Sequence, residues 1–318
     1  MGTERFHPWI VAVAFVGLGF VGASLAKPRA KRSTVATWAA IGILLALPWF
    51  CDAGRVGPRA VVTMACVALF TPKLVDALTA PAHWHGRSWR EWIAYLPTPC
   101  VLVHRGREGL PVAPPGRTPA RLLTRAAVQI AIGGLLLAWA MRADFAHSSF
   151  WLEHGVKLVA AYLLGFDGTF LLLEGIMRAL GVAVIDQTRD PALATTPADF
   201  WRRYNREAGR FFYADVFKPI GGRRHPRGAI VVTFLVNGAL HEYLAWILVG
   251  SIQGYQMTFF ALHGLAAALT FDLRPRGAFA RGVGLAVTLV FVYVTSVLFF
   301  ASVSQVFPWY ARGPLRPW

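Results

Sequence analysis

An all-α bundle of about eight membrane-spanning helices is the fold class that the sequence predicts, and three observations favour it. Of the 318 residues, 56% are hydrophobic and only 15% are charged, against about 25% charged residues in soluble domains. The chain contains several apolar runs near the length of about 17–25 residues that a helix needs to cross a bilayer. Its 32 Lys and Arg outnumber its 16 Asp and Glu, and this excess gathers in alternate loops.

Eight apolar runs define the expected helices, and together they predict one integral membrane domain over 1–318. They lie near 9–26, 35–50, 57–72, 122–141, 154–183, 228–250, 256–271 and 282–306. The fifth run contains Asp167, Glu174 and Arg178. Because ionisable groups are costly in contact with lipid, we expect this run to break or to face protein.

The loops between these runs indicate the topology through their charge. Segment 27–34 has four Lys/Arg and no acid, 73–121 has seven and three, 184–227 has nine and five, and 272–281 has three and one. With eight spans these segments fall on one side, which the positive-inside rule makes cytoplasmic. The sequence therefore predicts an integral protein of a bacterial-type inner membrane. The apolar runs argue against a basic nucleic-acid-binding protein, so no nucleic-acid partner is expected.

The segment 184–227 combines basic charge with many aromatic side chains, which a disordered loop lacks. We expect it to lie folded on the cytoplasmic membrane face, or to dip into it, with amphipathic helices. Thr196, Pro197 and Asp199 indicate a helix start, with Thr196 as the N-cap and Pro197 in the first turn. The helix predicted from this start runs to about Gly209.

His241 is the most informative residue, because it lies near the middle of the apolar run 228–250 with Glu242 beside it. An ionisable group at that depth costs about 2.5–3.5 kcal/mol on insertion scales and tends to face a cavity or a partner. Its unperturbed pKa of about 6.5 suits a general base for an alcohol. The competing interpretation is a pair of hydrogen-bonding residues that serve helix packing.

Other chemistries fail on spacing. A zinc protease needs a second His four residues after the first, and Ala245 stands there. Neither a Gly-x-Ser-x-Gly elbow nor a Gly-x-x-x-x-Gly-Lys phosphate loop occurs in the sequence. The three cysteines, Cys51, Cys66 and Cys100, lack metal spacing and are expected to be small apolar packing residues. We therefore expect no metal and no resident cofactor.

Three short motifs lie between residues 198 and 243. They are Ala-Asp-Phe-Trp-Arg-Arg-Tyr-Asn at 198–205, Phe-Phe-Tyr-Ala-Asp-Val-Phe-Lys-Pro at 211–219 and Asn-Gly-Ala-Leu-His-Glu-Tyr at 237–243. Together they resemble the membrane-bound O-acyltransferase superfamily, and they are most similar to its wax-synthase-like branch. Tyr204 stands where a Trp is common in the superfamily, and Asn237 stands where the branch often has Ser.

The resemblance implies transfer of an acyl group from acyl-CoA to the hydroxyl of a fatty alcohol or another lipid, as in a wax ester synthase. It implies that His241 is the catalytic base and that Asn205 orients it or the reacting groups. The residues expected to bind substrate are Trp201, Arg202, Arg203, Tyr204, Arg206, Lys218, Asn237 and Glu242. Adjacent helix residues point about 100° apart, so Glu242 is expected to serve packing more than chemistry.

Alternatives remain for the partners and for the function. The arginines suit the phosphates of CoA, but each could instead contact anionic membrane lipids, and Trp201 and Tyr204 could anchor the interface. A second hypothesis is an O-acetyltransferase that transfers an acetyl group to a polar or cell-surface glycan acceptor. A different class, a proton-coupled transporter, would use His241 and Glu242 as a relay and requires carboxylates along several spans.

Overall fold

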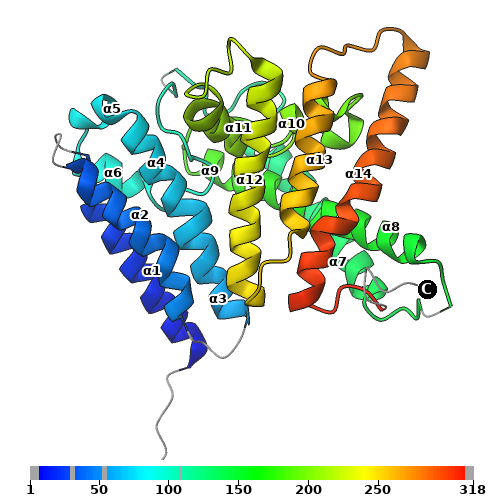
Figure 1. Ribbon diagram of the computed structural model, residues 1–318, viewed down its shortest axis with the longest axis horizontal. Helices are drawn as coiled ribbons and strands as arrows, with labels where there is room; N and C mark the ends of the chain where they lie inside the picture. The colour runs from blue at the N-terminus through cyan, green and yellow to red at the C-terminus, as the bar shows by residue number, and fades with distance from the viewer. Residues whose placement is uncertain (1–6, 29–32, 52–55, 108, 146, 312–318) are drawn as a thin grey trace, which may run out of the picture. The chain divides into compact units, whose positions relative to one another are not determined.

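The protein is described by a computed structural model that covers residues 7–28, 33–51, 56–107, 109–145 and 147–311. All regular secondary structure in these ranges is helical, which confirms the predicted all-α fold (Figure 1). Residues 29–32 of the predicted basic segment 27–34, which include the basic residues Arg29, Lys31 and Arg32, lie outside the described residues.

Six described helices are long and apolar enough to cross a membrane, by length and composition. They cover Pro8–Leu25, Val56–Thr79, Pro119–Ala140, Phe150–Ala179, Pro226–Val249 and Ala278–Val306. The predicted runs 35–50 and 256–271 also form helices, but these are not among the six. The second of them has 15 residues, and at about 1.5 Å per residue it spans about 22 Å of an apolar layer about 30 Å thick.

The chain divides into two compact units. The first contains residues up to Gly106 together with Tyr243–Ser251, and the second contains Arg107–Glu242 and Ile252–Trp318. The helices of the first unit are α1 (Pro8–Leu25), α2 (Ser33–Phe50), α3 (Val56–Thr63), a π-helical segment (Met64–Phe70), α4 (Thr71–Thr79), α5 (Pro81–His85) and α6 (Trp89–Tyr95).

Buried polar contacts and cysteines pack the first unit. Lys73 is fully buried, and its Nζ donates to the carbonyl oxygens of Tyr95, Leu96 and Thr98 at 2.6–2.7 Å. These contacts satisfy carbonyl groups at the end of α6, which no longer have partners inside the helix. The three cysteines are free and buried, which confirms their predicted role as small packing residues.

The second unit holds every residue of the predicted site. Its helices are α7 (Pro119–Ala140), α8 (Phe150–Ala161), a π-helical segment (Tyr162–Gly168), α9 (Thr169–Ala179), a 3-10 turn (Pro191–Leu193), α10 (Pro197–Arg203), α11 (Arg206–Phe212), a π-helical segment (Tyr213–Phe217), α12 (Pro226–Val249, as far as Glu242), α13 (Tyr255–Leu269) and α14 (Ala278–Val306).

Helix α7 packs along α8, the π-helical segment Tyr162–Gly168 and α9. The contact is close at Gly133, where an added Cβ would lie 2.6 Å from the backbone nitrogen of Leu164. Asp167, Glu174 and Arg178 of the predicted fifth run are all buried, and Asp167 accepts from Gln129 of α7 at 3.1 Å. The prediction that the fifth apolar run turns its charged side chains toward protein is therefore confirmed.

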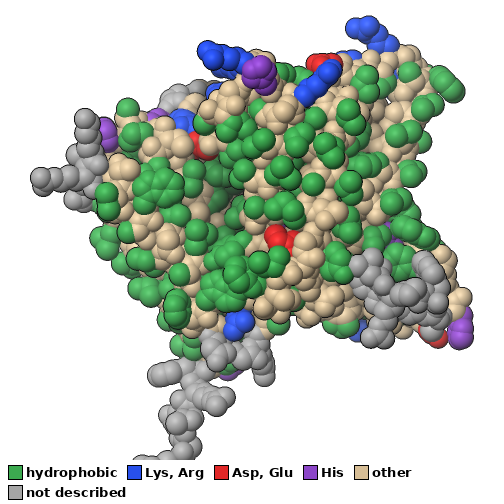
Figure 2. Space-filling model, in the orientation of Figure 1, with side chains coloured by type: hydrophobic (Ala, Val, Ile, Leu, Met, Phe, Trp, Pro, Cys, Tyr) green, Lys and Arg blue, Asp and Glu red, His purple; other side chains and the backbone are tan. Residues whose placement is uncertain are grey.

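Helices α13 and α14 run side by side in the second unit (Figure 1). Hydrophobic side chains are spread along their visible face, and the Lys and Arg side chains seen there lie near the helix ends (Figure 2). This distribution is what a helix in contact with lipid tails requires, because charged groups are costly away from the aqueous interface.

Candidate active site on helices α10 to α13

Helices α12 and α13 approach closely because each carries a glycine at the contact. A Cβ on Gly238 would lie 3.1 Å from Cβ of Phe260, and a Cβ on Gly264 would lie 2.6 Å from Cβ of Phe234. The space at Gly264 therefore admits no larger side chain unless Phe234 moves. This packing sets the turn of α12 that carries His241 against the aromatic side chains of α13.

The imidazole of His241 has its Nδ1 atom engaged in a hydrogen bond. This atom lies 3.0 Å from the carbonyl oxygen of Asn237, one turn earlier on α12. Because a carbonyl oxygen can only accept, Nδ1 carries the proton in the neutral ring and Nε2 keeps its lone pair. No hydrogen-bond partner for Nε2 is found in the described part of the chain. The ring centroid lies 4.4 Å from that of Phe260. The imidazole therefore packs against an aromatic side chain of α13, and we call Phe260 and the rings packed on it the aromatic wall.

The side chain of Asn237 also lies in this turn of α12, and its oxygen is unbonded within the described chain. Its side-chain Oδ1 is buried, and no donor to this atom is found among the described residues. Leaving a buried acceptor without a donor costs about 1–3 kcal/mol. An acceptor in this state one turn from His241 is suited to a donating group of a bound substrate. The substrate-binding role of Asn237 stays a prediction.

Glu242 is committed to the backbone of the next helix. One carboxylate oxygen accepts from the N–H groups of Gln253 and Gly254 at 2.8 and 2.7 Å. The other accepts from Gln256 and Met257 at 3.0 and 3.2 Å. These N–H groups lie at the start of α13, where a helix leaves its donors unsatisfied and favours a negative charge. The observed role of Glu242 is therefore to cap α13, and its contact with substrate stays a prediction.

The helix start predicted at Thr196 is confirmed, but the predicted length is wrong. The Thr196 hydroxyl accepts from the backbone N–H of Asp199 at 3.0 Å, as an N-cap does. Helix α10 then ends at Arg203, and α11 begins at Arg206. The residue between them that turns the chain is Asn205, so no single helix reaches Gly209.

Asn205 adopts a left-handed backbone conformation, with φ of 40°. Asn tolerates this region better than most residues because its short side chain can bond locally. Its Oδ1 accepts from the N–H of Ala208 at 3.4 Å and caps α11. No hydrogen bond between Asn205 and His241 is found within the described ranges, so their partnership in catalysis stays a prediction.

Trp201 lies against the same aromatic wall as His241. Its indole centroid is 5.2 Å from that of Phe234 and 5.8 Å from that of Phe260. Its Nε1 lies 3.0 Å from Nδ1 of His263, which is almost fully buried on α13. His263 was not among the predicted site residues, although a His in an apolar run is the signal that singled out His241.

Tyr204 fills the space between α10 and the fifth apolar run. Its ring packs against Phe166, Phe170 and Phe200, with centroid separations of 6.2, 5.8 and 5.7 Å. Burial, followed by the nearby charges of Tyr162 and Asp167, raises the pKa of its phenol above the ordinary value. Tyr204 is therefore a neutral packing group in this position.

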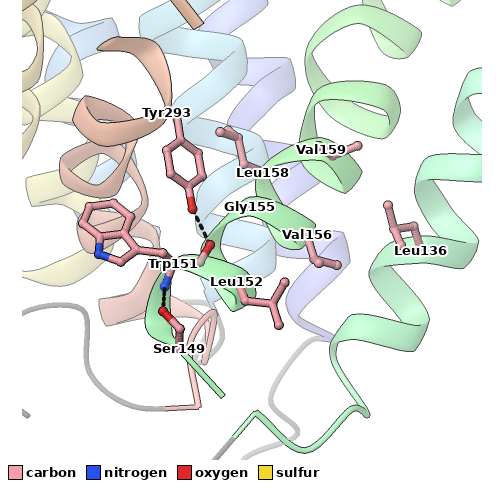
Figure 3. Close-up of a pocket in the computed structure, with 9 residues that line it drawn as sticks. All are labelled: Leu136, Ser149, Trp151, Leu152, Gly155, Val156, Leu158, Val159 and Tyr293. Carbon is pink, nitrogen blue, oxygen red and sulfur yellow. Dashed lines mark hydrogen bonds between the residues drawn. The ribbon is translucent and has the colours of Figure 1, made fainter. Parts of the chain in front are cut away.

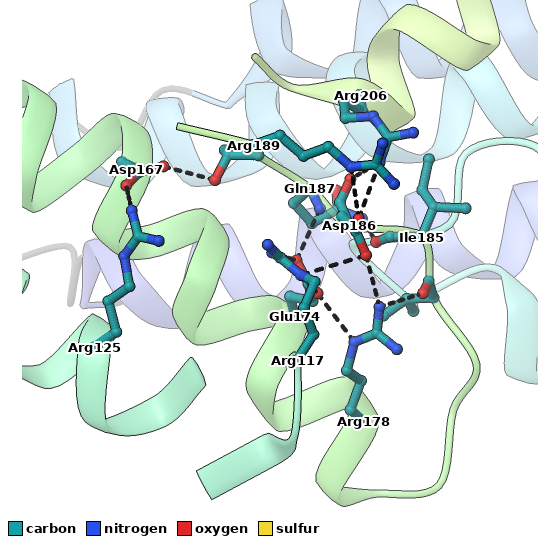
Figure 4. Close-up of polar contacts among 12 residues, drawn as sticks. Arg117, Arg125, Asp167, Glu174, Arg178, Ile185, Asp186, Gln187, Arg189 and Arg206 are labelled. Carbon is teal, nitrogen blue, oxygen red and sulfur yellow. Dashed lines mark hydrogen bonds and ion pairs between the residues drawn. The ribbon is translucent and has the colours of Figure 1, made fainter. Parts of the chain in front are cut away.

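Arg206 belongs to a network of arginines and two carboxylates (Figure 4). Arg117 holds Glu174 with two contacts of 2.8 and 2.6 Å. Asp186 receives Arg189 at 2.7 Å and Arg206 at 3.4 Å. Although burial opposes ionisation, Arg189 and the neighbouring arginine charges lower the pKa of Asp186. The network fixes the segment before α10 and keeps Arg206 partly exposed.

A polar pocket of about 260 Å³ gathers other arginines of the site. Arg202, Arg203 and Arg274 line it together with Thr195 and Asp199. Arg203 pairs with Asp199 at 2.9 Å. Burial and the positive charge of Arg274 lower the pKa of Arg202. Three arginines against one carboxylate leave a positive pocket that is suited to an anionic group. Arg274 was not predicted.

Lys218 does not line the polar pocket. Lys218 is exposed, with Nζ 4.8 Å from the ring centroid of Tyr213. A separate open groove of about 630 Å³ is lined by apolar residues of α7, α8 and α14, and no predicted site residue lines it (Figure 3). No group of three or more His, Cys, Asp or Glu side chains that could hold a metal ion is found in the ranges that the structure describes.

Comparison with known proteins connects this chain to enzymes that esterify alcohols. No protein-family model matches the chain. It is 29% identical over 177 residues to a long-chain-alcohol O-fatty-acyltransferase of Simmondsia chinensis, covering 51% of this chain and 49% of that protein. Two probable long-chain-alcohol O-fatty-acyltransferases of Arabidopsis thaliana also match. Number 6 is 30% identical over 183 residues, 53% of this chain and 52% of that protein. Number 1 is 35% identical over 145 residues, 40% and 42%.

The chain thus spans about half the length of the curated relatives it matches. The relatives' names agree with the predicted class of chemistry, acyl transfer to an alcohol. The chain is similar to long-chain-alcohol O-fatty-acyltransferases in about half of its own sequence.

Proposed function

We propose that this protein is an integral membrane O-acyltransferase of the wax-synthase-like branch of the membrane-bound O-acyltransferases. Its donor is acyl-CoA and its acceptor is a long-chain alcohol or another hydroxyl-bearing lipid. The observation that carries the proposal is the state of His241, whose Nδ1 is held by the Asn237 carbonyl at 3.0 Å while Nε2 is left with its lone pair. The names of the similar proteins support the class of acceptor.

The reaction needs one base. Nε2 of His241 takes the proton of the acceptor hydroxyl as its oxygen attacks the thioester carbonyl carbon. The new ester C–O bond forms, the C–S bond breaks, and the thiolate of CoA leaves with the bonding electron pair. The imidazolium then returns its proton to that thiolate, so His241 ends the cycle neutral. The Asn237 carbonyl favours the tautomer that this step requires.

The arginines of the second unit supply a place for the donor's phosphates. Arg202, Arg203 and Arg274 line the 260 Å³ polar pocket, and guanidinium groups bind phosphate oxygens through paired hydrogen bonds. Arg274 lies in the basic segment 272–281, and the other two lie in 184–227. We propose that both segments face the cytoplasm, from which a soluble donor such as acyl-CoA enters.

The test is acyl transfer by the purified protein in detergent or nanodiscs. It uses radiolabelled acyl-CoA with a panel of acceptors that includes long-chain alcohols and a polar sugar. Wild-type protein is expected to form labelled ester with the long-chain alcohols, and His241→Ala is expected to form none. Equal product from both proteins would overturn the mechanism. Product with the sugar alone would favour the glycan acceptor, and proton flux in liposomes without any product would favour a transporter.

Arg274 gives a separate test of the donor site. Arg274→Gln removes one positive charge from the pocket while it keeps a side chain that donates hydrogen bonds. It is expected to raise the KM for acyl-CoA about tenfold, since a hydrogen bond to a charged group contributes about 1.5–3 kcal/mol. The KM for the alcohol is expected to stay unchanged. Arg276→Gln, in the same loop, is the matched control.

A further inference from the structure

His263 has both ring nitrogens engaged, and the partners fix the direction of each hydrogen bond. The indole N–H of Trp201 can only donate, so Nδ1 of His263 is the acceptor at 3.0 Å. The proton of the neutral ring therefore lies on Nε2, which donates to the Thr295 hydroxyl oxygen at 2.8 Å. That hydroxyl donates in turn to the carbonyl oxygen of Phe291 at 2.7 Å. The sequence of bonds runs in one direction, from α10 through α13 to α14.

This hydrogen-bond pattern separates His263 from a reactive base. A base needs a free lone pair, and the only lone pair of His263 receives the Trp201 N–H. The ring is also enclosed, with its centroid 4.2 Å from that of Phe259 and 4.7 Å from that of Phe291. Its side chain is almost fully buried. His263 is therefore placed to hold Trp201 and not to exchange protons with a substrate.

Trp201 in turn touches the wall that His241 lies on. The indole packs edge-on against Phe234 and lies 5.8 Å from Phe260. The Phe260 ring lies 4.4 Å from the His241 imidazole. A rotation of the indole would disturb Phe260, because interiors are packed with few voids. The hydrogen bond from Trp201 to His263 removes that freedom by fixing the edge of the indole.

We propose that His263 is a positioning residue for the reaction. Through its hydrogen bond with the Trp201 indole, it holds the packed side chains of Trp201 and Phe260, against which the His241 base and the reacting thioester are aligned. This inference rests on the proposed acyltransferase function. It assigns to a histidine outside the predicted motifs a role in kcat and not in the binding of either substrate.

The test is a double-mutant cycle on steady-state acyl transfer. Trp201→Phe keeps a ring but removes the N–H, and His263→Gln removes the acceptor at the Nδ1 position while it keeps a donor near Thr295. Each change is expected to lower kcat about three- to tenfold, the effect of one neutral hydrogen bond of about 1 kcal/mol. The KM for acyl-CoA is expected to stay within about twofold of wild type. The double variant is expected to be no slower than the slower single variant.

Two further variants separate positioning from general stability. His263→Asn keeps an amide oxygen near the Nδ1 position and is expected to recover most of the kcat lost in His263→Gln. His154→Gln changes another buried histidine with both nitrogens engaged and serves as the matched control, with kcat per folded molecule unchanged. All rates are normalised to the folded fraction, measured by thermal unfolding of each variant.

The outcomes are distinguishable. Losses in kcat that multiply in the double variant, or an unchanged kcat in His263→Gln, would overturn the positioning role while wild-type ester formation still supports the proposed function. A wild-type protein that forms no ester with any acceptor would overturn the proposed function, and the positioning role with it. In that case the cycle in melting temperature would still measure the Trp201–His263 hydrogen bond as a structural contact.

Discussion

Two histidines in the second unit differ in how many of their ring nitrogens have hydrogen-bond partners. His154 on α8 has Nδ1 at 2.7 Å from the Tyr310 hydroxyl, and Nε2 at 2.9 and 3.0 Å from the Tyr293 carbonyl oxygen and the Ser296 hydroxyl. His241 on α12 has one engaged nitrogen and one without a partner in the described chain. His154 is fully buried with both nitrogens bonded, whereas His241 is partly buried with one nitrogen unbonded within the described residues. Under the proposed function, the lone pair on Nε2 of His241 is the feature that lets this residue act as the base.

The residues around His154 and His241 also differ in how far their polar groups are hydrogen-bonded. Next to His154, the Nζ of Lys157 donates to Glu153 at 2.6 Å and to the Trp309 carbonyl, and Glu153 also accepts from the N–H of Ala311 at 2.8 Å. These bonds tie the chain after α14 to α8. Around His241 the neighbours are aromatic rings and the buried Oδ1 of Asn237. The polar groups around His154 are bonded to one another, whereas next to His241 the Oδ1 of Asn237 has no donor among the described residues.

The largest expected effect separates the two histidines by activity. His241→Gln is expected to lower kcat by about 10²–10⁴-fold, the usual contribution of a general base. His154→Gln is expected to leave kcat per folded molecule unchanged and to lower the melting temperature instead. Ester formation and thermal unfolding, measured on the same preparations, check both. Equal losses of kcat in the two variants would remove the distinction between the two regions.

The next effect tests whether the His154 region is structural. Lys157→Met leaves the Glu153 carboxylate buried without its cation, and breaking a buried ion pair in this way costs about 3–5 kcal/mol. A large fall in melting temperature is expected. The double variant Glu153→Gln/Lys157→Met removes both charges and is expected to recover much of the lost stability. No recovery would show that the Lys157 side chain, and not the pairing of charges, holds the region.

A smaller effect is expected at Glu242, which lies beside the base but bonds to the backbone of α13. Glu242→Gln replaces one accepting oxygen by a donating NH₂ group that faces backbone N–H groups. The variant is expected to lose about 1.5–3 kcal/mol of stability, the range for hydrogen bonds to a charged group. Its kcat per folded molecule is expected to change much less than in His241→Gln. A raised KM without loss of stability would instead support the predicted contact with substrate.

The smallest effect concerns pH and the arginine network of Figure 4. The pKa of Asp186 is lowered in the folded protein, so its stabilising contribution is present above the unfolded carboxylate pKa of about 3.9. The contribution is lost as the pH falls through the lower folded pKa. Asp186→Asn is expected to melt below wild type at neutral pH, and the gap should close below about pH 4. A gap that is constant with pH would exclude an ionic cause.

Local signals in the sequence predicted much of the fold. The helix that carries His241 was expected over 228–250 and is found over Pro226–Val249. The Thr196 cap was expected and is found. Both depend on residues within a few positions of one another, namely an apolar run in the first case and a hydroxyl with a proline in the second. Such features are visible without knowledge of the tertiary structure.

The break at Asn205 and the role of His263 depend on contacts between distant residues. The chain turns at Asn205 because the N–H of Arg206 bonds to the Gln187 carbonyl and the N–H of Arg189 bonds to the Arg203 carbonyl, each at 2.9 Å. Trp201 and His263 are 62 residues apart. Arg274 joins Arg202 and Arg203 only through the folded loop. The spacing of residues in sequence carries no information about such pairs.

The carboxylate of Glu242 closes a loop of the chain, since the residue after the proposed base is bonded to the N–H of Gly254, 12 positions later. These hydrogen bonds therefore fix the position of α13, and of Phe260 on it, relative to the turn of α12 that carries His241. A single residue inserted in α13 between Met257 and Thr258, after the last N–H group that bonds this carboxylate, would turn Phe260 by about 100° relative to Glu242. In the proposed site, the spacing from Met257 to Phe260 along α13 therefore matters as much as the side chains themselves.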